Sequence, residues 1–183
     1  MKLFFKKYGK DGSDLIIIHG LFGMSDNWNT LGRKFSKHFK VHLIDLRNHG
    51  RSPHSSEFNY DVMCEDLIEY IEDYNIKKPI VIGHSLGGKV AMKLAFTHAE
   101  ILEKLLVADI SPRRYNTDFH ENLLKILYRL PLEDFSRRED IEEILAETFE
   151  NRGMRLFLMK NLYRNEDKKF AWRFNIGVLL EKV

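Results

Sequence analysis

PIVIGHSLGGKVAMKLAFT, residues 79–97, is the stretch that decides the fold. It opens with a short β-branched run, which predicts a strand, and closes with a segment of helical character. Ser85 stands between them, with one glycine two residues before it and another two residues after it. A serine at such a strand-to-helix turn is typical of a nucleophile elbow, where the turn is so sharp that side chains at the glycine positions would collide. The flanking strand and helix disfavour the alternative, a chance match in a loop, so we expect an exposed Ser85 hydroxyl at a sheet edge.

Strands and helices alternate through the first 110 residues. Apolar β-branched runs predict strands, and apolar residues at helical spacing predict helices. The expected strands are 2–8, 14–19, 41–45, 79–82 and 105–109, and the expected helices are 28–38, 60–74 and 86–97. This alternation predicts an α/β fold with a mostly parallel sheet and crossover helices.

The character of the sequence changes after Pro112. No β-branched run occurs from residue 116 to residue 164, and three apolar stripes at helical spacing lie at 123–130, 141–149 and 154–162. We expect a helical cap or lid over residues 113–183, following a core over residues 1–112. Aromatic and methionine side chains there could line a ligand cavity, although core packing is the commoner role of such stripes.

The composition excludes several classes of protein. The 29 Lys and Arg residues nearly balance 27 Asp and Glu residues, so the net charge of +2 predicts no nucleic-acid or membrane partner. Cys64 is the only cysteine, which rules out an intrachain disulfide and a cysteine-based zinc site. No apolar run is long enough for a secretory or transmembrane segment, so a cytoplasmic location is expected.

Two further segments carry polar or glycine-rich turns after predicted strands. The turn His19 to Gly23 can aim backbone N–H groups at a bound oxygen, as acyl transfer requires, although an ordinary connection is an equal alternative. The N–H of Leu86 would be a second donor. The loop from Asp45 to Ser52 is interpreted as a hydrogen-bonded brace, and His49 within it as structural rather than as a catalytic base.

Asp109 is the candidate acid, because a serine is activated by a base that an acid orients. It ends the strand after the elbow helix, so its carboxylate should emerge at the same sheet edge as Ser85. It could instead cap the turn that follows, at Ser111 and Pro112.

These four motifs together resemble the α/β-hydrolase fold family, most closely the small esterases of the YbfF type and their mitochondrial abhydrolase-domain relatives. The resemblance implies carboxylic-ester hydrolysis through an acyl-serine intermediate, without cofactor or metal. It implies Ser85 as nucleophile, Asp109 as acid, and Leu21 and Leu86 as oxyanion donors. We also expect Phe22 to contact the substrate, a small-molecule ester of short or medium acyl length.

The family's catalytic histidine does not have a counterpart at the expected place. All eight histidines precede residue 121, whereas the family's base follows the cap. The resemblance therefore implies a truncated chain that lacks the last strands, exposes the strand at 105–109 and is inactive by itself. Alternatives are a C–C hydrolase, lyase or perhydrolase on the same fold, or a non-catalytic binding protein. The oligomeric state is open.

Overall fold

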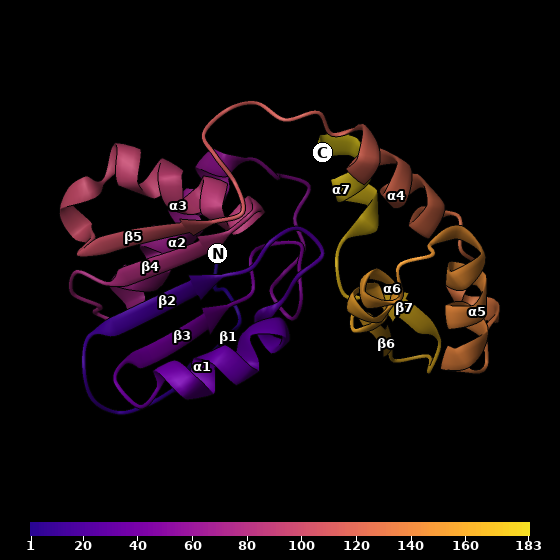
Figure 1. Cartoon of the computed structure of the whole chain (residues 1–183), viewed down its shortest axis with the longest axis horizontal. Coiled ribbons are helices and arrows are strands. Elements are labelled where there is room, and N and C mark those ends of the chain that lie inside the picture. Colours follow the sequence, from indigo (N-terminus) through magenta and orange to yellow (C-terminus); the bar gives the residue numbers. More distant parts are fainter. The chain divides into compact units, whose positions relative to one another are not determined.

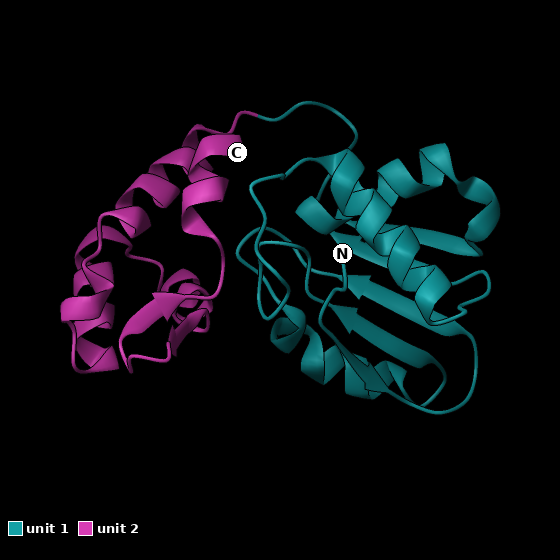
Figure 2. Ribbon diagram, turned by 180° about the vertical axis from the view of Figure 1, so that it is seen from behind, with its two compact units in different colours: residues 1–115 teal, residues 116–183 magenta.

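The computed structural model describes all 183 residues (Figure 1). They form two compact units, Met1–Tyr115 and Asn116–Val183 (Figure 2). The first unit is built on a five-stranded sheet, and the second is mostly helical. The predicted division into a core over 1–112 and a helical cap over 113–183 stays a prediction, because a compact fold alone does not show that the second unit acts as a cap.

The sheet of the first unit has the strand order β1-β3-β2-β4-β5. Its strands are β1 (Phe5–Tyr8), β2 (Asp14–Ile18), β3 (Lys40–Ile44), β4 (Ile80–His84) and β5 (Lys104–Ala108). Only β1 runs antiparallel to its neighbour, and the other pairs are parallel. The predicted α/β class with a mostly parallel sheet is confirmed. Parallel strands bring their carboxyl ends to one edge, and the turns after β2, β3, β4 and β5 therefore meet there.

Crossover helices connect the parallel strands. They are η1 (Ser25–Trp28), α1 (Asn29–Phe35), α2 (Tyr60–Asp73), α3 (Leu86–Thr97) and η2 (Ala99–Ile101). Asn59 caps α2 by accepting the N–H of Val62, and the helix buries its apolar stripe, as its spacing predicted. The helix expected over 28–38 is present as α1, but η1 precedes it and it is shorter than expected. It ends at Phe35, whose carbonyl accepts turn hydrogen bonds from His38 and Phe39.

The central strands form the core, whereas β5 is an exposed edge. Ile16 and Ile18 of β2 have no accessible surface, as expected of a strand covered on both faces. By contrast, Leu106 of β5 is 52% exposed and Phe96 of the preceding helix is 88% exposed. Because β5 pairs only with β4, one side of its backbone has no partner strand. The exposure expected for this strand is confirmed.

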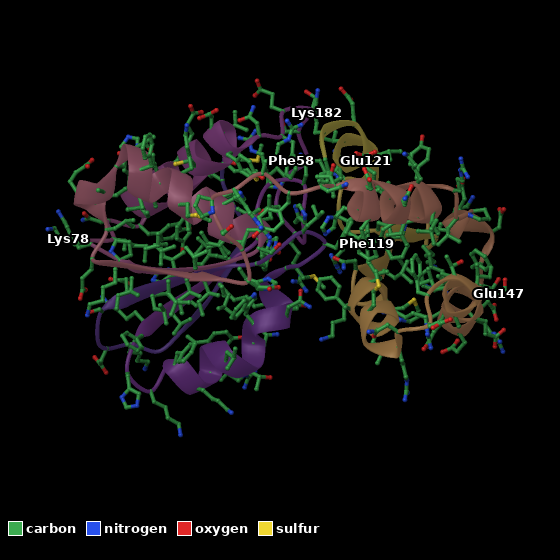
Figure 3. All side chains as sticks on the ribbon, turned by 45° about the horizontal axis from the view of Figure 1, so that its top comes forward. Phe58, Lys78, Phe119, Glu121, Glu147 and Lys182 are labelled. Carbon is green, nitrogen blue, oxygen red and sulfur yellow. The ribbon has the colours of Figure 1, made fainter.

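The second unit contains four helices and a small hairpin. Its elements are α4 (Asp118–Tyr128), η3 (Leu132–Asp134), α5 (Arg138–Thr148), α6 (Arg152–Met159), β6 (Leu162–Arg164), β7 (Phe170–Trp172) and α7 (Ile176–Lys182). The three predicted helical stripes are confirmed as α4, α5 and α6. The hairpin β6–β7 was missed, because strands of three residues give too short a pattern. Phe119, labelled on α4 in Figure 3, is 62% exposed.

Trp172 is a buried residue in the core of the second unit. Its ring stacks on Phe174 with the ring centres 5.3 Å apart, and its indole N–H donates to the carbonyl of Leu127 over 3.3 Å. These contacts tie the hairpin to α4, against which α7 also packs. No helix in either unit combines the length and the apolar character that crossing a bilayer requires.

Candidate active site

The turn between β4 and α3 holds Ser85 in a strained backbone conformation. Its φ of 49° and ψ of −114° lie outside the regions that residues with a side chain ordinarily occupy. The turn is fixed because Ser85 donates its N–H to the carbonyl of Ala108 over 3.0 Å. A Cβ atom on Gly83 would lie 2.4 Å from the carbonyl oxygen of Gly87, and one on Gly87 would lie 2.5 Å from that of His19. A side chain at either glycine position would therefore collide with the backbone, as the sequence predicts.

The backbone amides at the start of α3 have different hydrogen-bond partners. The N–H of Ser85, just before the helix, donates to the carbonyl of Ala108, and the N–H of Gly87 donates to the carbonyl of His19 over 3.1 Å. The N–H of Leu86, between them, donates to no backbone carbonyl, because the first amide of a helix has no acceptor within it. Leu86 directly follows Ser85 and is half-buried as a residue.

The turn from His19 to Gly23 lies against the same serine. A Cβ atom on Gly20 would lie 3.1 Å from Cβ of Ser85, so only glycine lets this backbone approach so closely. The N–H of Leu21, the next residue, donates to no backbone carbonyl. The structure therefore has two unused amides, those of Leu21 and Leu86, in the two turns that meet at Ser85.

Asp109 follows β5 at the same edge of the sheet. Ala108 pairs with His84 in the parallel register, so Asp109 lies beside the turn that carries Ser85. The carboxylate is 86% exposed, and Oδ2 lies 3.6 Å from Nε2 of His84. It accepts no hydrogen bond from the turn at 110–112, and the capping alternative gains no support. Its positive φ of 57° marks a tight turn directly after the strand.

The loop after β3 is a hydrogen-bonded brace, as the sequence predicted. Asp45 is fully buried, and its carboxylate accepts the N–H groups of Ser25 over 2.5 Å and Arg51 over 2.8 Å. Ser52 donates to the carbonyl of Asp45 and accepts the N–H of Phe4, which ties the loop to the chain entering β1. Burial raises the pKa of the Asp45 carboxyl, and the donated hydrogen bonds oppose that rise.

The sequence matches the alpha/beta hydrolase fold family over residues 15–175, which include every turn described above. The chain belongs to that family. Esterase YbfF of Escherichia coli is 31% identical over 172 residues, and the sn-1-specific diacylglycerol lipase ABHD11 of Danio rerio is 36% identical over 175 residues. A Haemophilus influenzae protein named as an esterase/lipase is 40% identical over 165 residues. The expected family resemblance is confirmed.

Among solved structures, a marine microorganism esterase superposes with a TM-score of 0.96 at 40% identity, over 98% of this chain and 71% of that one. The matches cover 94%, 91% and 90% of this chain for the Escherichia, Danio and Haemophilus proteins respectively. The chain spans 66%, 54% and 57% of the lengths of those three relatives. These relatives are therefore considerably longer than the segment that they share with this chain.

The histidines near Ser85 in this α/β hydrolase have other partners. No hydrogen bond joins an imidazole to the Ser85 hydroxyl. His49 is fully buried, its Nδ1 donates to the carbonyl of Arg47 over 3.0 Å, and burial lowers its pKa to about 3. The structural interpretation of His49 agrees with this environment. His19 is also buried, with its ring centre 5.2 Å from that of His49, and burial lowers its pKa to about 4.

The remaining predicted contact is the substrate-binding side chain of Phe22. The Phe22 side chain is buried, with 3% exposure, and its backbone has a positive φ of 60°. Its contact with a substrate stays a prediction. Sequence reasoning missed the pairing of His84 with Asp109, which depends on the register between β4 and β5. No group of three or more His, Cys, Asp or Glu side chains is placed to hold a metal ion.

Proposed function

We propose that this α/β hydrolase cleaves carboxylic esters of small or medium acyl groups through an acyl-serine intermediate on Ser85. The observation that carries the proposal is the strained serine with unused amides in the two turns that meet at it. Strain of this kind persists where the surrounding structure enforces it, and it exposes a hydroxyl that a relaxed turn would cover. The esterase and lipase names of the relatives support the same chemistry.

The reaction assigns one role to each residue. The Ser85 oxygen attacks the ester carbonyl while a base removes the hydroxyl proton, and the carbonyl oxygen becomes an oxyanion. The N–H groups of Leu21 and Leu86 donate to this oxyanion. The alcohol then leaves with a proton from the base, and a water molecule hydrolyses the acyl-serine by the reverse steps. Asp109 orients the base and stabilises its protonated form.

None of the three histidines described at this edge of the sheet is placed to act as that base. His19 and His49 are buried and neutral, and His84 has its Nε2 directed at Asp109. We therefore propose that residues 1–183 contain the nucleophile and the acid without the base, and that they hydrolyse esters very slowly by themselves. A binding protein without catalysis is the second candidate, and the observation behind it is that no imidazole of residues 1–183 hydrogen-bonds to the Ser85 hydroxyl. The cytoplasmic location and the small-molecule partner stay predictions from the sequence.

Added imidazole separates the two candidates. Residues 1–183 are assayed against p-nitrophenyl butyrate with and without imidazole, and the identical mixture containing the Ser85→Ala variant measures the hydrolysis that imidazole performs alone. An esterase lacking only its base gives imidazole-dependent turnover above the Ser85→Ala rate. Equal rates for the two proteins at every imidazole concentration would overturn the proposed hydrolase function and favour the binding protein.

A further inference from the structure

The carbonyl group of Gly20 is held by two donors. It accepts the N–H of Gly23 over 2.9 Å, and Nδ1 of His19 lies 2.8 Å from the same oxygen. One donor comes from the turn itself and the other from the side chain of the preceding residue. Because both distances are those of well-formed hydrogen bonds, the peptide unit that joins Gly20 to Leu21 has little freedom to rotate.

The protonation state of His19 is determined by its two neighbours. Leu46 donates its N–H to Nε2 over 3.0 Å, so Nε2 must offer a lone pair. Burial lowers the pKa of His19 to about 4, so the ring is neutral at pH 7 and has one N–H. That proton must be on Nδ1, where it donates to the carbonyl of Gly20. His19 thus links the turn after β2 to the loop after β3.

Because the peptide bond is trans, the position of the Gly20 carbonyl determines where the N–H of Leu21 points. All peptide bonds in the chain are trans, and the C=O and N–H groups of a trans peptide point to opposite sides. With the Gly20 carbonyl held toward His19 and Gly23, the N–H of Leu21 points away from both. It donates to no backbone carbonyl, and the adjacent Gly20 lies against Ser85.

We propose that His19 is a positioning residue, whose Nδ1–H holds the Gly20–Leu21 peptide so that the Leu21 N–H is directed at the oxyanion. This inference rests on the proposed esterase function, and it assigns a role to a histidine that neither acts as the base nor touches the substrate. Without the Nδ1 donor, the Gly20–Leu21 peptide can rotate and its amide no longer meets the developing charge. Removal of one oxyanion donor lowers turnover by about 10²–10³-fold, which is the upper limit for the effect.

Two substitutions separate the two hydrogen bonds of His19. In His19→Asn, the side-chain NH₂ lies near the position of Nδ1 and can donate to the Gly20 carbonyl. In His19→Gln, the amide reaches the position of Nε2 and can accept the Leu46 N–H, but it leaves the Gly20 carbonyl with one donor. We expect the Gln variant to lose at least about 10-fold in imidazole-assisted kcat with KM unchanged, and the Asn variant to stay within about 3-fold of the original.

His42→Gln is the matched control. His42 is equally buried and also bridges two partners, Tyr70 and Asp14, but it lies in the middle of β3, away from the turns at Ser85. We expect it to lower thermal stability while leaving the kcat of the folded protein unchanged. If His19→Asn and His19→Gln lose kcat equally, or if His42→Gln loses as much as His19→Gln, the positioning role is wrong.

Butylboronic acid gives a readout that needs no turnover. Ser85 adds to the trigonal boron, an O–B bond forms, the hydroxyl proton goes to solvent, and the tetrahedral anion resembles the intermediate of ester hydrolysis. Its dissociation constant should rise at least about 10-fold in His19→Gln and change little in His19→Asn. A chain that binds the boronic acid but fails to turn over ester contradicts only the proposed function. Equal boronic acid affinities in all three proteins, or no binding by the unsubstituted chain, would overturn the role of His19.

Discussion

Oδ2 of Asp109 lies 3.6 Å from Nε2 of His84, the residue that immediately precedes Ser85. The relationship follows from the register of two parallel strands, because His84 pairs with Ala108 and Asp109 is the next residue of β5. Parallel strands end at a common edge, which brings together side chains that are 25 residues apart in the sequence. The candidate acid therefore lies at the same edge as Ser85.

Replacement of Asp109 by asparagine should lower imidazole-assisted ester turnover by about 10-fold or more. The carboxylate would stabilise the imidazolium that forms as Ser85 attacks, and an amide cannot do so. The measurement is the initial rate against p-nitrophenyl butyrate at fixed imidazole concentration. Asp73→Asn, an exposed acid at the end of α2, is the control and should be without effect. An Asp109→Asn variant with unchanged turnover would show that the acid is another residue.

Replacement of Ser85 by glycine should increase the free energy of unfolding by about 1 kcal/mol while removing ester turnover. Glycine adopts the φ of 49° without the steric cost that serine bears there. For a chain of this size the melting temperature should rise by about 2–4 °C. Ser36→Gly is the control, since Ser36 has a helical φ of −63°, and glycine there should destabilise. A melting temperature that falls in Ser85→Gly would argue against strain at the turn.

Stability should decline as the pH falls from about 6.5 toward 4. Burial lowers the pKa of His19 to about 4 and that of His49 to about 3, whereas both rings have a pKa near 6.5 in the unfolded chain. In that window the unfolded chain binds more protons, so stability is fully present above pH 6.5 and is lost on acidification. Urea unfolding at pH 7 and pH 4.5 measures the loss. His49→Phe, which cannot be protonated, should show a smaller difference between the two pH values, and an unchanged difference would exclude His49 as a cause.

The exposed edge strand should make residues 1–183 self-associate. One side of the β5 backbone is unpaired, and Leu105 and Leu106 are 36% and 52% exposed, which together form a template for strand pairing. Size-exclusion chromatography with light scattering should detect species larger than a monomer. Leu106→Lys should shift them toward the monomer, because a charged edge opposes pairing. Leu31→Lys is the control, because Leu31 on α1 is also exposed, at 42%. Monomeric protein at all concentrations would contradict the expectation.

The sequence by itself determined the α/β class, the order of the strands along the chain and the sharp turn at Ser85. These features depend on local physics. A glycine two residues before and after Ser85 is required wherever the chain turns so sharply, and the β-branched run before it forms a strand in any context that buries it. The boundaries of most strands and helices were predicted within one or two residues for the same reason. The exceptions are β1, which begins at Phe5 rather than at residue 2, and α1, which ends at Phe35 rather than at residue 38.

Only the tertiary structure decided which polar groups meet. The pairing of His84 with Asp109 depends on the register of β4 with β5, and register is set by packing across the sheet rather than by either strand alone. The bridge from His19 to Leu46 joins turns that follow two different strands, so no sequence spacing encodes it. Burial then fixed the neutral state of both His19 and His49, because desolvation depends on everything packed around a side chain and not on its neighbours in the chain.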